Sequence, residues 1–575
     1  MEKKDRMAPL KWWQKAVFYQ IYPRSFADGN GDGIGDFIGM TERLDYLADL
    51  GIDAIWISPH FPSPQFDVGY DVSDYVGVAP EYGTLDDFKR FLDGAHQRGI
   101  RVILDLVLNH TSHLHQWFIE SCSSRDHPRR DWYIWRDGKN GGPPNNWNSP
   151  FGGSAWKYDE TTDQFYYHYF LTEQPDLNWR NPEVKKAMWE AVRFWLDLGV
   201  DGYRLDAIGT IFENPAMPDH PCKMTQEEMR RALNHGFPDG SDKKVGTLWK
   251  SMYGEQYEQE GVHELMQELR AVIDEYPDRV LVGENDDVKY YGDGSNELHM
   301  VFNFPLMKTE RITAPWVRAN QKERLASLPP GAWPCNTLNN HDTSRLLNRY
   351  GDGQHDDAIA RTSLALMLTL RGTPFLYNGE EIGMSDYRLP DISFFRDPPA
   401  VWFYNGEISS GTSPETALLL AADDSRDRCR TPMPWSNVVN AGFSPEGVTT
   451  WLPVNPNYAK GINVADQRDH PESMLNFYKR MLRIRKQTPA LINGDYTPLH
   501  ETAENYFAFL RHSDDPEQTC LVVLNLSDKA LTLKFELQGG AARGLFSSHK
   551  PGSETVRLGV LELAPFEIYI AELIS

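Results

Sequence analysis

Carboxylate side chains follow several short apolar runs of the chain. The stretches are DLVLNH, GYRLDA, VGEN and NNHD, in that order along the 575 residues. They place Asp206, Glu284 and Asp342 directly after apolar segments. One such Asp is most often the N-cap of a following helix, but several in order indicate a shared site. Two facing carboxyl groups could act as a nucleophile and as a general acid.

Arg204 stands two residues before Asp206 in GYRLDA. Side chains at that spacing leave the same face of an extended strand. The guanidinium can therefore donate charge-assisted hydrogen bonds to the carboxylate, and we expect it to hold the pKa of Asp206 low. An ionised Asp206 would be suited to nucleophilic attack.

The elements that must carry these residues alternate along the chain. Runs that are apolar on both faces predict buried parallel strands, and amphipathic helical periods separate them, for example over 85–98, 184–198 and 357–370. We predict an α/β fold, a closed (β/α)8 TIM barrel whose chemistry lies at the carboxyl ends of the strands. An open, doubly wound sheet is the alternative. The expected strands are 17–21, 54–57, 102–106, 202–205, 280–282, 301–304, 337–338 and 374–376.

Two long stretches interrupt this alternation, and the end of the chain differs from the rest. Residues 111–174 are rich in Trp, Asn, Gly and Pro, and we expect an inserted loop-rich subdomain after the third strand. A second interruption spans about 379–470. Alternating strand patterns predict a C-terminal antiparallel β-sandwich domain over 493–575. The catalytic barrel would then comprise residues 1–110 and 175–492.

The composition excludes several classes of protein. Hydrophobic residues make up 40% of the chain, enough for a large core, which argues against disorder. The net charge of −24, with no Lys- or Arg-rich run, disfavours nucleic acid and anionic membranes as partners. Five scattered cysteines without a CxxC pair disfavour a disulfide framework and a zinc site. Without an apolar signal segment or a run of roughly 18 apolar residues, we expect a cytoplasmic monomer or homodimer.

The chain resembles the α-amylase superfamily of retaining α-glycoside hydrolases over nearly its whole length. DLVLNH, GYRLDA, VGEN and NNHD carry this resemblance, and QPDLNW, GYDVSDY and CRTPMPW are similar to the oligo-1,6-glucosidase and α-glucosidase branch. The resemblance implies that Asp206 is the nucleophile, Glu284 the acid/base, and Asp342 a carboxylate that grips sugar hydroxyls. Retaining hydrolysis needs such a pair of carboxyl groups. The implied reaction releases α-glucose from the non-reducing end of short α-glucosides through a covalent glucosyl–enzyme intermediate.

The same resemblance implies a closed pocket for one terminal glucose. Arg430 is matched to an arginine that pairs with the counterpart of Asp67 and closes the pocket behind the sugar. Ordinary packing is the alternative for the two phenylalanines of the set, and a surface ion pair is the alternative for Arg430. The implied sugar-binding residues are Asp67, Tyr70, His110, Phe151, Phe170, Gln174, Arg204, Ala207, His341 and Arg430.

Ala207, directly after the implied nucleophile, bears on the linkage that is cleaved. In this branch a valine there accompanies α-1,6 preference, whereas alanine leaves room for α-1,4 substrates. The resemblance therefore implies a maltose-type preference with α-1,6 cleavage as a side activity. Two departures from the branch, ENDDV after the acid and Pro434 in CRTPMPW, leave transfer of glucose to another acceptor open. The alternative enzyme is a glucosyltransferase or an isomerase of the trehalose or isomaltulose synthase type, and a non-catalytic relative would lack the carboxylates.

Oxygen-bearing residues recur at every second position from Asp28 to Asp36. This is the spacing at the start of an EF-hand loop, with Gly33 at its sixth position, although Gly39 replaces the bidentate glutamate at its end. The loop resembles the structural cation site of the branch, and a metal-free turn is the alternative. The implied cofactor is one structural Ca²⁺ or Mg²⁺, with no organic cofactor. Its ligands would be the side chains of Asp28, Asn30, Asp32 and Asp36 and the carbonyl of Ile34.

Overall fold

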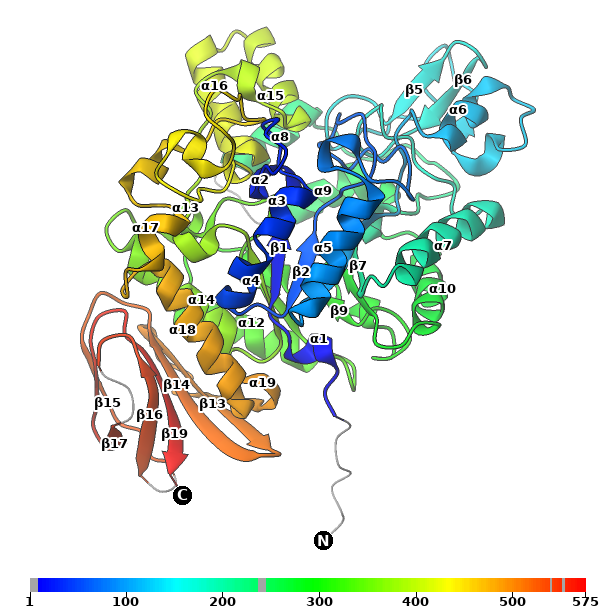
Figure 1. The fold of residues 1–575 in the computed structure, drawn as a ribbon. Helices are drawn as coiled ribbons and strands as arrows, with labels where there is room; N and C mark the ends of the chain where they lie inside the picture. Colours follow the sequence, from blue (N-terminus) through cyan, green and yellow to red (C-terminus); the bar gives the residue numbers. More distant parts are fainter. Residues whose placement is uncertain (1–8, 236–244, 538–539, 551–553, 575) are drawn as a thin grey trace.

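The structure, a computed structural model, describes residues 9–235, 245–537, 540–550 and 554–574. Within these ranges eight parallel strands form a sheet that curls into a nearly closed barrel (Figure 1). Their spatial order is β10-β11-β1-β2-β3-β7-β8-β9, and a parallel bridge between Phe302 and Cys335 joins the two ends. The predicted TIM barrel is confirmed and the open sheet is excluded. The strands are β1 (Phe18–Ile21), β2 (Ala54–Ile57), β3 (Arg101–Val107), β7 (Gly202–Asp206), β8 (Val280–Gly283), β9 (Met300–Val301), β10 (Cys335–Thr337) and β11 (Thr373–Tyr377).

The strands have apolar residues on both faces because one face packs inside the barrel and the other packs against the helices. Trp56 and Val282 belong to a cluster inside the barrel, whereas Ile55 and Leu281 belong to a larger cluster between the strands and the helices. Because side chains alternate along a strand, Glu284 follows Val282 on the inner side. Inside the barrel, the side chains are therefore apolar along the strands and become carboxylates at the carboxyl ends of the strands.

Helices cover the outside of the barrel, and α5 shows why they form where they do. Thr84 caps its first turn by accepting a hydrogen bond from the Asp87 N–H, while Asp87 Oδ2 accepts one from the Thr84 N–H at 2.8 Å. Phe88, Phe91 and Leu92 recur at helical spacing and are buried against the strands. The long outer helices are α5 (Leu85–Gln97), α7 (Pro182–Asp197), α10 (Val262–Asp274), α12 (Ala314–Ser327), α14 (Asp356–Thr369) and α18 (Met474–Gln487). Shorter helices are α1 (Trp12–Lys15), α2 (Pro23–Phe26), α3 (Phe37–Glu42), α4 (Leu44–Leu50), α8 (Gln226–His235), α9 (Val245–Tyr253), α11 (Phe304–Met307), α13 (Leu346–Tyr350), α17 (Val464–Arg468) and α19 (Pro489–Asn493).

The two sequence interruptions meet above the barrel. The first holds α6 (Gln116–Ser123) and a three-stranded sheet of β4 (Trp135–Arg136), β6 (Gln164–Tyr167) and β5 (Trp156–Asp159). The second includes α15 (Pro398–Ser409) and α16 (Pro414–Asp424), which lie near the top of the view in Figure 1. A Cβ atom at Gly152 would lie only 2.4 Å from Trp402 of α15, so the two excursions touch.

The C-terminal region forms a six-stranded antiparallel sheet, in the order β12-β13-β14-β19-β16-β17, faced by the β15–β18 pair. Within the described residues of this region, the second layer of the predicted sandwich is therefore two strands wide. Buried Arg511 ties this sheet to the barrel by donating to the carbonyls of Thr369 and Gly494. The strands are β12 (Asp495–Leu499), β13 (Tyr506–Asp514), β14 (Glu517–Asn525), β15 (Leu531–Leu533), β16 (Ala541–Ser547), β17 (Thr555–Arg557), β18 (Leu561–Leu563) and β19 (Ile568–Ile574).

All five cysteines carry free thiols. Among the helices of the described ranges, none has the length and apolarity needed to cross a membrane.

Candidate active site

Arg204 connects the two carboxylates that the sequence assigns to catalysis. Its side chain is buried on the inner side of β7, where Nη1 lies 2.7 Å from Asp206 Oδ1 and Nη2 lies 3.0 Å from Glu284 Oε2. Nη1 also lies 2.7 Å from Asp105 Oδ1 on the neighbouring strand β3. One guanidinium thus binds the carboxyl groups of Asp206 and Glu284, which follow from the neighbouring strands β7 and β8.

The backbone of Ala207 orients the second carboxylate. Its φ of 40° lies in the left-handed region, which costs a residue with a Cβ atom roughly 1–2 kcal/mol. In this conformation the Ala207 N–H donates to Glu284 Oε2 at 2.8 Å. The strained turn after β7 therefore holds Glu284 beside Asp206.

The protonation of the cluster differs from the sequence-based expectation. Burial raises the pKa of Asp206 well above its ordinary value, and Arg204 lowers it only in part because Glu284 and Asp105 also repel a negative charge. Burial likewise raises the pKa of Asp105 to about 6. The expectation that Arg204 holds the pKa of Asp206 low is wrong, because burial opposes the charge and three carboxyl groups share one guanidinium.

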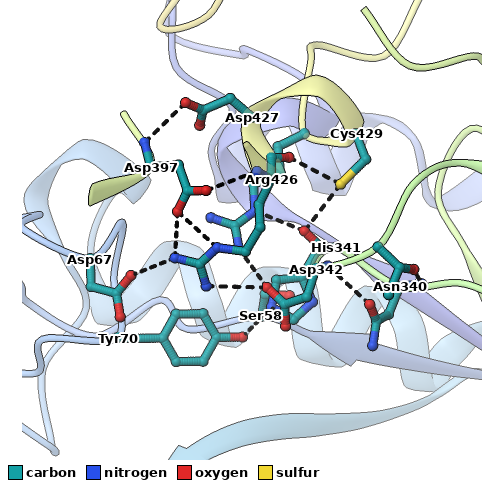
Figure 2. A network of polar contacts seen from close by, with 12 residues as sticks. Ser58, Asp67, Tyr70, Asn340, His341, Asp342, Asp397, Arg426, Asp427 and Cys429 are labelled. Carbon is teal, nitrogen blue, oxygen red and sulfur yellow. Dashed lines mark hydrogen bonds and ion pairs between the residues drawn. The ribbon is translucent and has the colours of Figure 1, made fainter. Parts of the chain in front are cut away.

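Asp342 is held ionised by its neighbours (Figure 2). Arg430 Nη2 lies 2.6 Å from Asp342 Oδ1, and Arg426 Nη1 lies 3.4 Å from the same oxygen. Burial opposes ionisation, but the adjacent His341 ring and these two guanidinium groups lower the pKa of Asp342 below the ordinary carboxylic range. A permanent negative charge here can stabilise a positively charged sugar ring.

The polar residues implied for the glucose pocket lie together. Gln174 Nε2 donates to Asp67 Oδ2 at 3.0 Å and lies 2.9 Å from His110 Nε2. Across the pocket Tyr70 Oη lies 2.6 Å from His341 Nε2, with the two rings parallel. Burial lowers the pKa of His110 to about 3, so this imidazole is neutral. The site therefore offers neutral donors and acceptors beside charged carboxylates, which suits a sugar.

Arg426, which the sequence analysis did not select, makes the contact expected of Arg430. Its Nη2 lies 3.2 Å from Asp67 Oδ1 and 2.6 Å from Asp397 Oδ1. Arg430 is instead fully buried, with Nε donating to the His341 carbonyl at 2.8 Å. The expected pairing of Arg430 with Asp67 is therefore wrong. The sequence signal was the motif SRDRCR, in which three arginines at every second position, Arg426, Arg428 and Arg430, were candidates for this contact.

Aromatic side chains from the first insertion form one wall. Phe151 and Phe170 lie with ring centres 5.2 Å apart, and Phe170 contacts His110 in turn. The Arg426 guanidinium lies over the Phe151 ring at 5.4 Å. A cavity of about 330 Å³ begins beside Asp342 and Arg426 and is lined mainly by Pro150, Phe151, Met229, Trp249, Tyr253 and Trp402. Phe151 thus faces a cavity, whereas Phe170 packs between Phe151 and the histidine.

In the implied cation loop, side-chain oxygen atoms of the loop accept hydrogen bonds from its own backbone N–H groups. Asp28 accepts hydrogen bonds from the Gly31 and Gly33 N–H groups, and Asp36 accepts from those of Gly29 and Asn30. Elsewhere in the loop the Ile34 N–H donates to Asp32 Oδ1 at 2.9 Å. Across the described residues, no three His, Cys, Asp or Glu side chains form a metal-binding group. The metal ligands that the sequence implies also include the side-chain amide oxygen of Asn30 and the carbonyl oxygen of Ile34. Ca²⁺ and Mg²⁺ bind oxygen atoms of these kinds.

The barrel, the paired carboxylates and the polar pocket define a glycosidase. Residues 20–494 match the family described as Alpha amylase, catalytic domain, and residues 496–570 match the Maltogenic Amylase, C-terminal domain. The chain belongs to the α-amylase family, glycoside hydrolase family 13, and is a glycoside hydrolase that acts on oligosaccharides.

Individual relatives cover nearly the full chain. An oligo-1,6-glucosidase of Parageobacillus thermoglucosidasius is 41% identical over 539 residues, which are 90% of this chain and 91% of that protein. A probable α-glucosidase of Rhizobium meliloti is 40% identical over 536 residues, covering 92% and 91%. The solved structure of the trehalulose synthase MutB from Pseudomonas mesoacidophila has a TM-score of 0.85 and 37% identity, covering 98% of this chain and 100% of that one.

Proposed function

We propose that the protein is a retaining, exo-acting α-glucosidase that releases α-glucose from short α-glucosides. The observation that carries this proposal is the binding of Asp206 and Glu284 by the single guanidinium of Arg204. An inverting hydrolase separates its two carboxyl groups by about 6.5–9.5 Å to admit a water, whereas a retaining one needs them about 5–5.5 Å apart. A shared guanidinium supports the shorter separation.

In the proposed reaction Asp206 attacks the anomeric carbon while Glu284 protonates the glycosidic oxygen. The bond to the leaving sugar breaks and a glucosyl ester of Asp206 forms. Glu284, now ionised, takes a proton from water, and the resulting hydroxide displaces the ester with retention of the α configuration. Asp342 stabilises the positive charge on the sugar ring in both steps, because it stays ionised.

The exo action follows from the wall behind the pocket. Asp67 and Asp342 are joined by Arg426, and Gln174 binds Asp67 from the other side. These contacts support a pocket closed at one end, which admits only a terminal glucose. We further propose that Ala207 leaves room for α-1,4 substrates, with α-1,6 cleavage as a side activity.

A product profile tests the function. The enzyme is incubated separately with maltose, isomaltose, sucrose and trehalose, and the anomer of the released glucose is recorded before mutarotation. We expect α-glucose, with maltose turned over faster than isomaltose. Initial β-glucose would refute retention, and faster turnover of isomaltose would refute the linkage preference. Conversion of sucrose into an isomer without free glucose would assign the chain to the synthase type instead.

We also propose that Asp28, Asn30, Asp32, Ile34 and Asp36 bind one structural Ca²⁺ or Mg²⁺. The turns that already order this loop support the proposal, because they leave little of it to be ordered by the ion. A bound cation would supply rigidity to the start of α3 rather than a chemical step.

A further inference from the structure

A turn outside the catalytic pair contacts both loops that carry it. Tyr257 and Glu258 form this turn, just after the short 3-10 helix at residues 254–256. The Glu258 N–H donates to the Gly209 carbonyl at 2.7 Å, three residues beyond Asp206. Glu258 Oε1 accepts a hydrogen bond of 2.8 Å from Nδ2 of Asn285, the residue after Glu284. A single residue thus links the loop of the proposed nucleophile to the loop of the proposed acid.

The amide of Asn285 is fully used by these contacts. Besides Glu258, its Nδ2 donates to Tyr257 Oη at 3.1 Å, and its Oδ1 accepts from the Asp287 N–H at 2.8 Å. Asn285 is only 5% exposed. It therefore holds the loop after Glu284 in place rather than offering its amide to an acceptor sugar.

The approach of the turn to the nucleophile loop is close and strained. A Cβ atom at Gly209 would lie 2.5 Å from the Tyr257 ring and 2.9 Å from Glu258 Oε1, so this contact needs a glycine. Glu258 itself has a φ of 56°, in the left-handed region that residues with a Cβ atom avoid. Strain of this kind persists where surrounding contacts over-determine the backbone. Tyr290 Oη supplies another of them, at 3.1 Å from Glu258 Oε1.

We propose that Glu258, with Tyr257, is a positioning residue that holds Glu284 in line with the leaving-group oxygen by fixing Asn285 onto the Gly209 loop. The proposal rests on the proposed function, in which Glu284 is the acid. Without this anchor the strand-end loop of Glu284 gains freedom, while Asp206 stays bound to Arg204. Protonation of the leaving group should then suffer more than nucleophilic attack.

Two substrates separate these steps. In the cleavage of maltose the leaving group is a glucose, whose oxygen must be protonated by a well-placed acid. In the cleavage of α-glucosyl fluoride the leaving group is a fluoride ion, which departs with little help from an acid. For Glu258→Ala we expect kcat/KM to fall by about 10- to 100-fold on maltose, a part of the roughly 10²- to 10⁴-fold contribution of a general acid, and by less than about threefold on the fluoride. Glu258→Gln keeps an acceptor oxygen and should restore most maltose activity. Glu260→Ala removes a carboxylate two residues further on that is exposed, as Glu258 is, and it is the matched control that should change neither rate.

The outcomes are distinct. Equal losses on both substrates, or no loss on maltose, would overturn the positioning role. In a double-mutant cycle with Asn285→Ala, additive losses would also overturn it, because the two residues are proposed to act through one contact. If Glu258→Ala does not fold, Tyr257→Phe removes only a hydroxyl and should show a smaller loss that is again confined to maltose. A wild-type enzyme that turns over neither substrate would instead refute the proposed function.

Discussion

Arg426 Nη2 lies 3.2 Å from Asp67 Oδ1, although the two residues are 359 positions apart in the sequence. The same guanidinium contacts Asp342 and Asp397, so it joins the loop after β2 to the third carboxylate of the site. Because Asp67 and Asp397 are buried, the contacts of Arg426 with them are stronger than those of an exposed ion pair. Arg426 therefore forms the back wall of the proposed glucose pocket.

Replacing this arginine should weaken turnover. A hydrogen bond to a charged group contributes about 1.5–3 kcal/mol, so we expect Arg426→Lys to lower kcat/KM on maltose by roughly 10- to 100-fold. Arg388→Lys, which alters the exposed pair with Asp423, is the control and should leave turnover unchanged. Initial rates of glucose release measure both. Equal activity of the two variants would show that Arg426 does not shape the pocket.

The carboxylate pair gives the second prediction. Asp206→Asn should abolish measurable turnover, because an amide cannot form the glucosyl ester. Glu284→Gln should lower kcat on maltose by about 10²- to 10⁴-fold, the usual contribution of a general acid. Asp286→Asn changes the exposed pair with Lys308 and should retain activity. Circular dichroism checks that each variant is folded, and a folded variant of either catalytic residue with full activity would contradict its role.

Much of the barrel could be predicted from the sequence because its signals are local. The run VILDL is buried in β3, and GYRLD forms β7, as the apolar pattern predicts. The place of Asp206 in the site can be predicted because it stands at the carboxyl end of a strand, and parallel strands present these ends at one edge of the barrel. The chain pattern thus indicates which side chains share a layer.

Other features depend on contacts that no local pattern encodes. Arg426 and Arg430 are four residues apart, and only the fold decides which of them reaches Asp67. The pKa of Asp206 depends on burial and on Asp105 and Glu284, which come from other strands. The links of Glu258 to Asn285 and Gly209 join three separate loops. Sequence reasoning found the residue types but not these pairings.

Removing the proposed cation gives the third prediction. A ligand present at 100 times its Kd stabilises the folded state by about 2.7 kcal/mol. We therefore expect EDTA to lower the unfolding temperature in a scanning experiment, with recovery when Ca²⁺ or Mg²⁺ is added back. EGTA, which prefers Ca²⁺, should act alike only if Ca²⁺ is the ion. Asp28→Asn should be less stable and insensitive to chelator, and an unchanged unfolding temperature after exhaustive chelation would contradict the site.

His60 gives the last prediction, on stability and its dependence on pH. The ring is fully buried, parallel to Phe88 at 5.3 Å and edge-on to Trp195 at 4.9 Å. Among the described residues neither ring nitrogen has a hydrogen-bond partner. An unpaired buried polar group costs about 1–3 kcal/mol, so His60→Leu, which nearly conserves volume, should raise the free energy of unfolding by an amount in this range at pH 7.

The sign of the pH effect follows from protonation. Burial lowers the pKa of His60 from its ordinary value of 6.5 to about 3, so between these values the unfolded chain binds a proton that the folded chain does not. The wild-type protein therefore loses stability as the pH falls below 6.5, and the advantage of His60→Leu should grow down to about pH 3. Urea unfolding at pH 7, 6 and 5 measures the difference. His96→Leu should not reproduce this gain, because it removes the 2.7 Å contact between His96 Nε2 and Asp201 Oδ2 and leaves the buried Asp201 carboxylate without this partner. A constant or shrinking advantage of His60→Leu at lower pH would show that the imidazole finds a proton acceptor in the folded state.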